Sequence, residues 1–247
     1  MTKIYHIAGS DVQPCDRAIA EVASILSAGG LALVPTETVY GLSVAVDACE
    51  AGTAHPGESQ PLVNGAAVPA EDSGYRRIFS VKHRDLAQTV PWLVSGTKDL
   101  DRFGKDIDAA TRALADAFWP GALTLIVPAN ERVPRFMQAA DGTVALRCSA
   151  SPVIAALIEA CACPLATTSA NTHGRPAPAA WGEIEPEVLQ GVDAAIDAGE
   201  TICRDASTIV TCTSGELAIV RHGALSDEDV IRVACAAGAR VRASSRQ

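Results

Sequence analysis

Stretches with helical periodicity and short apolar runs of strand length follow one another along most of this chain. Residues 16–28 place their apolar side chains on one helical stripe, Gly29-Gly30 stop the helix, and residues 31–34 form an apolar run of strand length. The same order recurs in "DIDAATRALADAFWPG" followed by "ALTLIV", and in "SPVIAALIEACA" followed by "PLATT". This alternation predicts an α/β fold in which helices flank a sheet.

The last third of the chain adds shorter strand patterns. The segments "GVDAAIDAG", "STIVTCT" and "ELAIVRHG" are closely spaced around Ser214-Gly215, which predicts antiparallel pairing there and therefore a mixed parallel and antiparallel sheet. Residues 226–237 are expected to form a final helix capped by Ser226. We predict a single domain over residues 1–247 that ends in a short helical tail, residues 226–247.

One segment interrupts this pattern. Residues 49–74 are rich in Gly, Pro, Ala and Glu and show no sustained periodicity. Loops above about 12 to 15 residues without secondary structure are uncommon inside compact domains and are usually functional lids or mobile insertions. We therefore predict a long loop insertion over residues 49–74.

The composition limits the classes of protein to which the chain can belong. With 247 residues, 48% hydrophobic and 20% charged, it is typical of a soluble globular protein. It has no run of about 18 uncharged apolar residues, and its first residues lack the basic start and apolar stretch of a signal peptide. We expect a cytoplasmic protein without a membrane partner.

Charge and cysteine content narrow the ligands further. The formal net charge of -9 argues against a broad phosphate-binding surface, so direct RNA binding should be weak or absent and small anions are favoured as ligands. The eight cysteines lie mostly in apolar segments, and the close pair Cys161 and Cys163 lacks a second pair to complete a zinc site. We expect reduced core thiols and no metal held by protein side chains.

Hydroxyl side chains recur at every second position in "PTETVYGL". In an extended segment Thr36, Thr38 and Tyr40 would share one face and line one wall. The alternative is a strand end that runs into a turn at Gly41, with β-branched residues chosen for strand propensity. The motif alone does not distinguish the two.

Two further motifs repeat this spacing. In "IFSVKHRDL", Lys82 and Arg84 would point the same way from an extended segment, which is unfavourable unless an anion or solvent relieves the repulsion. In "LATTSANTHGRP", Ser169 and Asn171 follow a strand at its carboxyl end, where open α/β sheets bind ligands. The alternatives are a solvated basic edge for the first motif and turn chemistry for the second.

The order of the motifs is more specific than any of them alone. The segments "PTETVYGL", Lys-x-Arg, "FWPGALTL", "VALR", "TTSANTHGRP", "STIV" and "VRHGAL" follow one another over residues 15–226. In this order the chain resembles the YrdC-like family, whose best-known members are threonylcarbamoyl-adenylate synthases that supply a transfer RNA modification. The resemblance implies a twisted α/β sheet around a deep anion-binding cavity, in the short form of the family without an extra C-terminal domain.

The resemblance also implies a reaction. A nucleotidyltransferase of this family would convert ATP, bicarbonate and L-threonine to threonylcarbamoyl-adenylate and pyrophosphate, with Mg²⁺ bridging the phosphates and a downstream tRNA-modifying transferase using the product. No covalent nucleophile is required, because the amine captures carbon dioxide and the carbamate attacks the α-phosphate of ATP. Positioning and charge neutralisation would then dominate catalysis.

Individual residues take their expected roles from the same resemblance. Lys82 and Arg84 would be catalytic and would hold the phosphates and the bicarbonate-derived carboxylate. Arg147 would pair with the carboxylate of the amino acid, because a guanidinium matches that group bidentately. The nucleotide side would also include Thr143, Ser169, Asn171 and Arg221, and the amino-acid side would include Thr38, Tyr40, Thr167 and Ser207.

The chain departs from the family pattern near the expected amine site. Asp85 replaces the proline that normally follows Lys-x-Arg, and "TVPWLVSG" lacks the expected histidine. Thr168 and His222 also stand where the family's motifs have proline. The alternatives are therefore a paralogue that carbamoyl-adenylates a different amine or amino acid, and a noncatalytic RNA-binding module.

Overall fold

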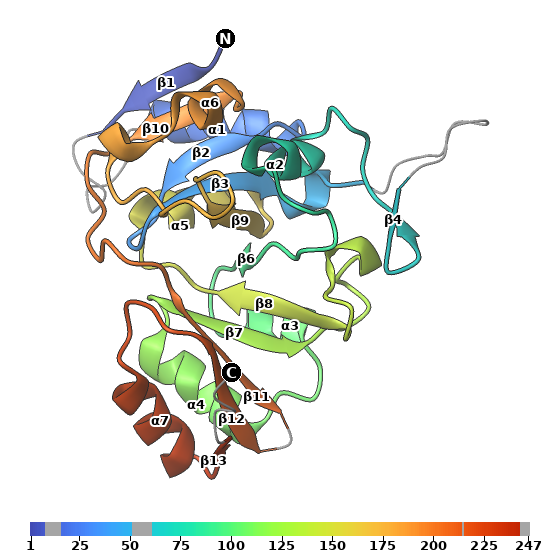
Figure 1. Cartoon of the computed structure of the whole chain (residues 1–247), viewed down its shortest axis with the longest axis vertical. Coiled ribbons are helices and arrows are strands. Elements are labelled where there is room, and N and C mark those ends of the chain that lie inside the picture. Colours follow the sequence, from blue (N-terminus) through green and yellow to red (C-terminus); the bar gives the residue numbers. More distant parts are fainter. Residues whose placement is uncertain (8–15, 51–60, 214, 243–247) are drawn as a thin grey trace.

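The computed structural model describes residues 1–7, 16–50, 61–213 and 215–242. Eleven of the described strands form one sheet in the order β1-β10-β2-β3-β9-β6-β8-β7-β11-β12-β13 (Figure 1). The strands are β1 (Lys3–His6), β2 (Ala32–Pro35), β3 (Tyr40–Ala45), β4 (Leu62–Val63), β5 (Ala66–Ala67), β6 (Trp92–Leu93), β7 (Leu123–Pro128), β8 (Thr143–Arg147), β9 (Leu165–Ser169), β10 (Ala194–Asp197), β11 (Thr208–Thr213), β12 (Glu216–Arg221) and β13 (Arg240–Val241). The α-helices are α1 (Asp16–Ser27), α2 (Gly74–Lys82), α3 (Asp99–Phe103), α4 (Ala109–Phe118), α5 (Pro152–Cys161), α6 (Pro186–Gln190) and α7 (Asp227–Ala236).

Parallel and antiparallel neighbours alternate irregularly across this sheet. The parallel pairs are β1–β10, β10–β2, β6–β8, β7–β11 and β12–β13. The antiparallel pairs are β2–β3, β3–β9, β9–β6, β8–β7 and β11–β12. The predicted mixed sheet with flanking helices is confirmed, and β11 and β12 form the antiparallel pair expected from the close spacing of their sequences.

Helices pack on the sheet in separate groups (Figure 1). α1 and α5 pack on each other and on β2, whereas α4 and α7 pack on each other and on the β7, β11 and β12 region. α2 packs on β3 and on α6. The apolar stripe of α1 is buried as its periodicity predicts, with Val22 and Leu26 fully inaccessible. At α7 the Ser226 hydroxyl accepts a hydrogen bond from the Asp229 N–H at 3.2 Å, which confirms the expected cap.

A two-residue strand joins the two halves of the sheet. β6 lies between β9 and β8 and pairs with each of them through two residues. Its Trp92 is fully buried and packs edge-to-face on Phe103, with ring centroids 5.2 Å apart. Nothing in the sequence analysis predicted this strand, because two residues are too few to show a period.

Parts of the predicted loop have regular structure. Leu62–Val63 and Ala66–Ala67 pair antiparallel around Asn64 and Gly65, which both have positive φ, at 51° and 74°. This is the Asn-Gly hairpin turn, a strong local signal that the sequence analysis missed. Residues 51–60 of the predicted loop, and residues 243–247 of the predicted tail, lie outside the described residues.

The segment that carries Lys82 and Arg84 is helical rather than extended. Lys82 is the last residue of α2, and His83 ends the helix in the left-handed conformation with φ of 51°. The expectation of an extended Lys-x-Arg segment is therefore wrong, because the apolar run before it belongs to a helical stripe that includes Ile78 and Phe79. Within the described part of the chain, no helix is both long and apolar enough to cross a membrane.

Candidate active site

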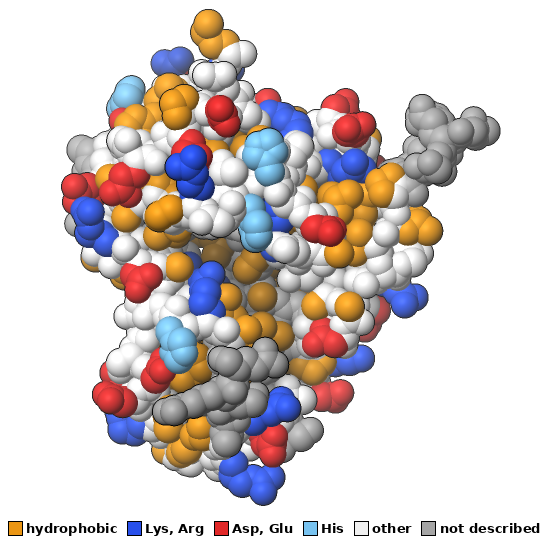
Figure 2. All heavy atoms as spheres, in the orientation of Figure 1, with side chains coloured by type: hydrophobic (Ala, Val, Ile, Leu, Met, Phe, Trp, Pro, Cys, Tyr) orange, Lys and Arg blue, Asp and Glu red, His pale blue; other side chains and the backbone are white. Residues whose placement is uncertain are grey.

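A cavity of about 80 Å³ lies where the two halves of the sheet meet. We call it the central cavity, and Figure 2 shows the molecule hollowed between its upper and lower parts. Residues from the β2–β3 turn, β9, β6, β8, β7 and the β11–β12 pair contribute to it. Its lining consists of Thr36, Thr38, Val39, Tyr40, Gly41, Pro91, Leu93, Thr124, Arg147, Thr167, Thr168, Ser169, Ala206, Ser207 and Arg221.

Strand alternation explains how the polar side chains reach the central cavity. Thr167 lines it, whereas the preceding Ala166 belongs to the main hydrophobic core. On β8, Arg147 lines the central cavity and the preceding Leu146 belongs to the main hydrophobic core. Successive side chains of a strand point to opposite faces, so at these positions one face supplies the core and the other supplies the polar wall. At the end of β9 this alternation no longer holds, and Thr168 and Ser169 both line the cavity.

The hydroxyls of the "PTETVYGL" motif do not form the predicted ladder. Residues 36–39 make a turn between β2 and β3, in which the Oγ1 atoms of Thr36 and Thr38 lie 2.8 Å apart. The Tyr40 hydroxyl instead donates to the Gly199 carbonyl at 3.0 Å and accepts from the Ala198 N–H at 2.9 Å. Burial raises the pKa of Tyr40 to about 12. Tyr40 therefore anchors the segment after β10. The extended alternative for this motif is wrong, although Thr36, Thr38 and Tyr40 all line the central cavity.

Arg147 is held in place by a buried ion pair. Its Nη2 lies 2.5 Å from Oε1 of Glu37, and its Nε donates to the Gly121 carbonyl at 3.0 Å. The other Glu37 oxygen accepts from the Ser149 hydroxyl. Burial alone would raise the pKa of Glu37, but the Arg147 charge and the hydrogen bonds from Ser149 and Arg147 outweigh it and hold that pKa below its ordinary value.

Sequence reasoning missed Glu37. In an extended motif it would lie on the face opposite to the hydroxyls, and the sequence analysis gave it no role. No local pattern identifies its partner, because Arg147 is 110 residues away along the chain. The only signal in the sequence was an acidic residue between two threonines, directly after an apolar run. It indicates an ion pair only once the fold places a cation beside it.

A second guanidinium, that of Arg221, enters the same cavity from the end of β12. Its Nη2 donates to the Ser207 carbonyl at 2.5 Å and to the Ser207 hydroxyl at 3.0 Å. The Ser207 hydroxyl also lies 2.8 Å from that of Thr124, a wall residue that the sequence analysis did not select. Partial burial and the nearby charge of Arg147 lower the pKa of Arg221. Arg147 is already paired with Glu37, whereas Arg221 forms no ion pair with the other described residues, so the cavity keeps a positive charge that favours an anionic ligand.

Lys82 lies behind the wall of the central cavity. Its Nζ donates to the carbonyls of Ser169 and Asn171, at 2.5 and 2.7 Å, and to Oδ1 of Asn171 at 3.1 Å. These three bonds use the three protons of an ammonium group. Burial and the charge of Arg84 lower the pKa of Lys82 to about 8. Lys82 therefore fixes the end of β9 and the turn that follows it.

The remaining predicted residues fall into two places. Arg84 reaches the same end of β9, where its Nη1 donates to the Thr168 hydroxyl at 3.2 Å, and the Ser169 hydroxyl donates to Oδ1 of Asn171 at 2.5 Å. Thr143 stands at the opposite end of β8 from Arg147 and donates to Asp141 at 2.7 Å. Lys82, Arg84 and Asn171 thus contact the end of β9 without lining the central cavity, and Thr143 lies away from it. The other predicted residues line it, and the chemical roles of all of them stay predictions: Thr38, Tyr40, Arg147, Thr167, Ser169, Ser207 and Arg221.

The donor set of the central cavity suits an anion better than a protein-held cation. Its polar groups are hydroxyls and guanidiniums, and none of its lining residues is acidic. Nowhere in the described ranges do three His, Cys, Asp or Glu side chains come close enough to hold a metal ion. Mg²⁺ prefers carboxylate, water and phosphate oxygens, so it would arrive with the phosphates of a nucleotide substrate.

The chain is similar to known proteins over most of its length. The family model Sua5_yciO_yrdC, described as telomere recombination, matches residues 65–223. The threonylcarbamoyl-AMP synthase of Xanthomonas euvesicatoria pv. vesicatoria is 33% identical over 195 residues, which are 78% of this chain and 89% of that protein. The threonylcarbamoyl-AMP synthase of Pyrococcus abyssi is 30% identical over 211 residues, 85% of this chain.

Nearly the whole of this chain resembles part of a solved structure. The crystal structure of Pyrococcus abyssi Sua5 complexed with L-threonine matches with a TM-score of 0.78 and 27% identity, and covers 98% of this chain. This chain corresponds to 63% of that structure and to 55% of the curated Pyrococcus abyssi synthase. It therefore spans little more than half the length of these archaeal relatives.

Proposed function

This chain belongs to the Sua5/YciO/YrdC family, and on that premise we propose that it makes threonylcarbamoyl-AMP and pyrophosphate from L-threonine, bicarbonate and ATP. The observation that carries the proposal is the pair of guanidiniums, Arg147 and Arg221, in one cavity with hydroxyls on several walls. The substrates bring a carboxylate, a carbamate and a triphosphate, and guanidinium and hydroxyl groups are the donors that recognise such anions.

The chemistry needs no nucleophile from the protein. Bicarbonate takes up a proton and loses water to give carbon dioxide, and the threonine amine adds to it and releases a proton. An oxygen of the resulting carbamate then forms a bond to the α-phosphorus of ATP, and the bond to pyrophosphate breaks. Arg147 would bind the amino-acid carboxylate, with Thr38 and Ser207 orienting the amine and the small polar side chain. Arg221 would offset charge on the nucleotide, and Mg²⁺ bound to the triphosphate would be part of the substrate.

Lys82 and Arg84 would act from behind the wall. The bonds of Lys82 to Ser169 and Asn171 support a role in shaping the nucleotide side of the cavity. A direct contact with phosphate requires the ammonium to give up one of these acceptors. The central cavity, at about 80 Å³, is also smaller than the roughly 300–1,000 Å³ of most ligand pockets, so substrate binding must widen it.

A different amine is the second candidate. The Thr168 hydroxyl stands in the lining where the family's motif has proline, and it already accepts a hydrogen bond from Arg84. An extra hydroxyl changes which side chain the pocket can satisfy, because a buried hydroxyl left unpaired costs affinity. The reaction would be the same, with another α-amino acid as the acceptor of carbon dioxide.

One experiment separates these candidates. The protein is incubated with ATP, bicarbonate, Mg²⁺ and a mixture of all standard amino acids, and the products are identified by mass spectrometry while pyrophosphate is measured. Threonylcarbamoyl-AMP as the main product supports the proposal, and another carbamoyl-adenylate supports the paralogue. Absence of any adenylate, together with a mobility shift of transfer RNA, would replace both with the RNA-binding module. A tRNA-modifying transferase would consume the product in a coupled assay.

A further inference from the structure

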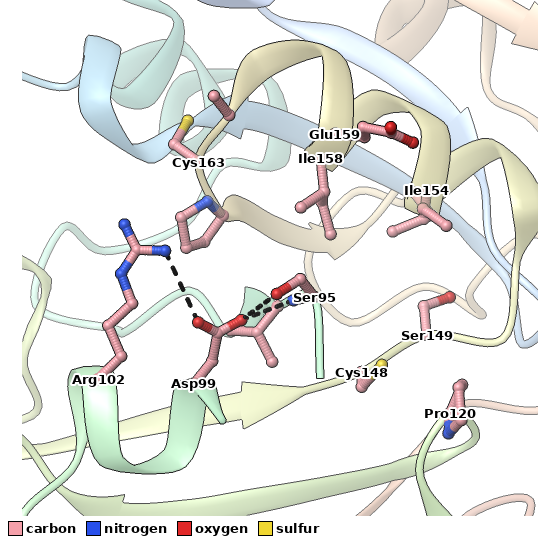
Figure 3. Close-up of a pocket in the computed structure, with 14 residues that line it drawn as sticks. Ser95, Asp99, Arg102, Pro120, Cys148, Ser149, Ile154, Ile158, Glu159 and Cys163 are labelled. Atoms are coloured by element: carbon pink, nitrogen blue, oxygen red, sulfur yellow. Dashed lines mark hydrogen bonds and ion pairs between the residues drawn. The ribbon is translucent and has the colours of Figure 1, made fainter. Parts of the chain in front are cut away.

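A second cavity, of about 440 Å³, lies apart from the central cavity (Figure 3). α5 contributes Ile154 and Ile158 to it, α3 contributes Asp99, and the segments after β6 and β8 complete it. Its volume falls within the roughly 300–1,000 Å³ of small-molecule pockets. None of the residues assigned to the proposed reaction lines it.

Asp99 gives this cavity a buried carboxylate with unused acceptor capacity. The residue is only 5% exposed. Its Oδ2 accepts from the Ser95 N–H at 2.8 Å and from the Ser95 hydroxyl at 2.7 Å. Its Oδ1 faces Arg102 across 3.7 Å, which is too long for a hydrogen bond. One oxygen of a carboxylate in an apolar setting thus lacks a close donor among the described residues.

Arg102 is a weak competitor for that oxygen. Half of its side chain is exposed, and its guanidinium lies over the Phe103 ring, 4.9 Å from the centroid. Glu159 adds a second carboxylate at the exposed edge of the cavity. The charged groups that line it are therefore two acids and one base, so a single positive charge on a ligand would balance them.

The opposite wall is apolar. In Figure 3 the Ile154 and Ile158 side chains descend from α5 toward the interior, across from Asp99, and Cys163 and Pro120 lie at the sides. Ile154 is 1% exposed and Ile158 is 7% exposed, so both are fixed parts of the protein interior. A ligand body against this wall would be a short hydrocarbon chain or a small ring.

We propose that the second cavity is a binding site for a small organic ammonium compound, with the ammonium on Oδ1 of Asp99 and a short apolar body against Ile154 and Ile158. An anion would meet two carboxylates, and a neutral alcohol would donate one hydrogen bond to Oδ1 without balancing the negative charge. An ammonium group donates the same bond and adds the attraction between opposite charges. The site therefore selects the cation over an uncharged molecule of equal size.

The test uses n-butylammonium as the probe, with 1-butanol and butyrate as molecules of matched size. Each is titrated into the whole protein carrying ¹³C-labelled isoleucine methyl groups, and chemical shifts are followed by NMR. Saturable shifts of Ile154 and Ile158 are expected with butylammonium, at about tenfold lower concentration than with butanol. The methyl groups of Ile78, which is buried in the other hydrophobic cluster, should not move. Equal responses to butylammonium and butanol would overturn the proposal, as would no response.

Variants link the response to the carboxylate. Asp99→Asn keeps the shape and an acceptor for Ser95, and it should weaken butylammonium binding about tenfold. Glu131→Gln, at an exposed acid outside the cavity lining, is the matched control and should change it less than about twofold. Should Asp99→Asn not fold, Arg102→Ala decides: removal of the competing cation should tighten butylammonium binding about threefold, and weaker or unchanged binding would refute the role of Asp99.

Discussion

Removal of the Glu37 carboxylate should leave Arg147 as an uncompensated charge in the interior. Both side chains are almost inaccessible, at 6% and 8% exposure, so solvent can do little to screen the change. Two charge-assisted hydrogen bonds end at this carboxylate, from Arg147 and Ser149, and each is worth about 1.5–3 kcal/mol. Breaking a buried pair by removing one partner typically costs about 3–5 kcal/mol. We expect Glu37→Ala to lower the free energy of unfolding by that amount.

A double-mutant cycle measured by urea unfolding checks the origin of the loss. Arg147→Met alone should be costly because it strands Glu37, whereas Glu37→Ala with Arg147→Met should cost clearly less than the sum of the single changes. The pKa of Glu37 is lowered in the folded protein, so its contribution is fully present above the ordinary value of 4.5 and is lost as the pH falls through the folded-state pKa. Additive single changes, or a loss below about 1 kcal/mol for Glu37→Ala, would refute the buried-pair argument.

Three other predictions follow from single contacts. Arg221→Ala should reduce the rate of pyrophosphate release about ten- to hundredfold, whereas His222→Ala, an exposed neighbour outside the cavity lining, should leave it unchanged. The pKa of Lys82 is about 8 in the folded protein and 10.5 ordinarily, so between these pH values the unfolded chain binds more protons than the folded one. The stability, followed by thermal unfolding, should therefore rise from pH 8 to 10.5, and this rise should disappear in Lys82→Met. Val68→Ala should lower the free energy of unfolding by about 1–3 kcal/mol in urea titrations, because Val68 is fully buried in the main core although it lies in the segment predicted as a loop.

Local signals predicted most of the regular structure. α1, α4, α5 and α7 have caps or apolar stripes within their own sequences, so each was recognised without knowledge of its neighbours. The sequence analysis did not recognise the Lys82 segment as helical, because α2 has only nine residues and ends at His83. His83 adopts the left-handed conformation in which a glycine would have marked the helix end in the sequence. β6 and the order of strands depend on partners distant in the chain, which single-sequence periodicity does not contain.

In the candidate site, too, local sequence predicted some features and tertiary contacts decided the others. Short motifs in the sequence contained many of the hydroxyl and guanidinium side chains that line the cavity. Among them, Thr38, Thr167, Ser207 and Arg221 all line the central cavity. Their hydrogen bonds were not visible, because each depends on a strand pairing or a turn formed elsewhere. Tyr40 illustrates the limit, since the hydroxyl that looked available in the sequence is held by the backbone after β10.

β6 is only two residues long, yet it is the strand through which one half of the sheet pairs with the other. The main core continues across it, because Trp92 and Leu146 belong to the same cluster. The indole N–H of Trp92 is buried without an acceptor among the described residues, an arrangement that costs about 1–3 kcal/mol. The half that includes β8 and β12 carries the guanidiniums of Arg147 and Arg221, and the half that includes β9 carries the hydroxyls of Thr167 and Ser169. Any change in the angle between the two halves at β6 would therefore change the separation between these two groups of donors.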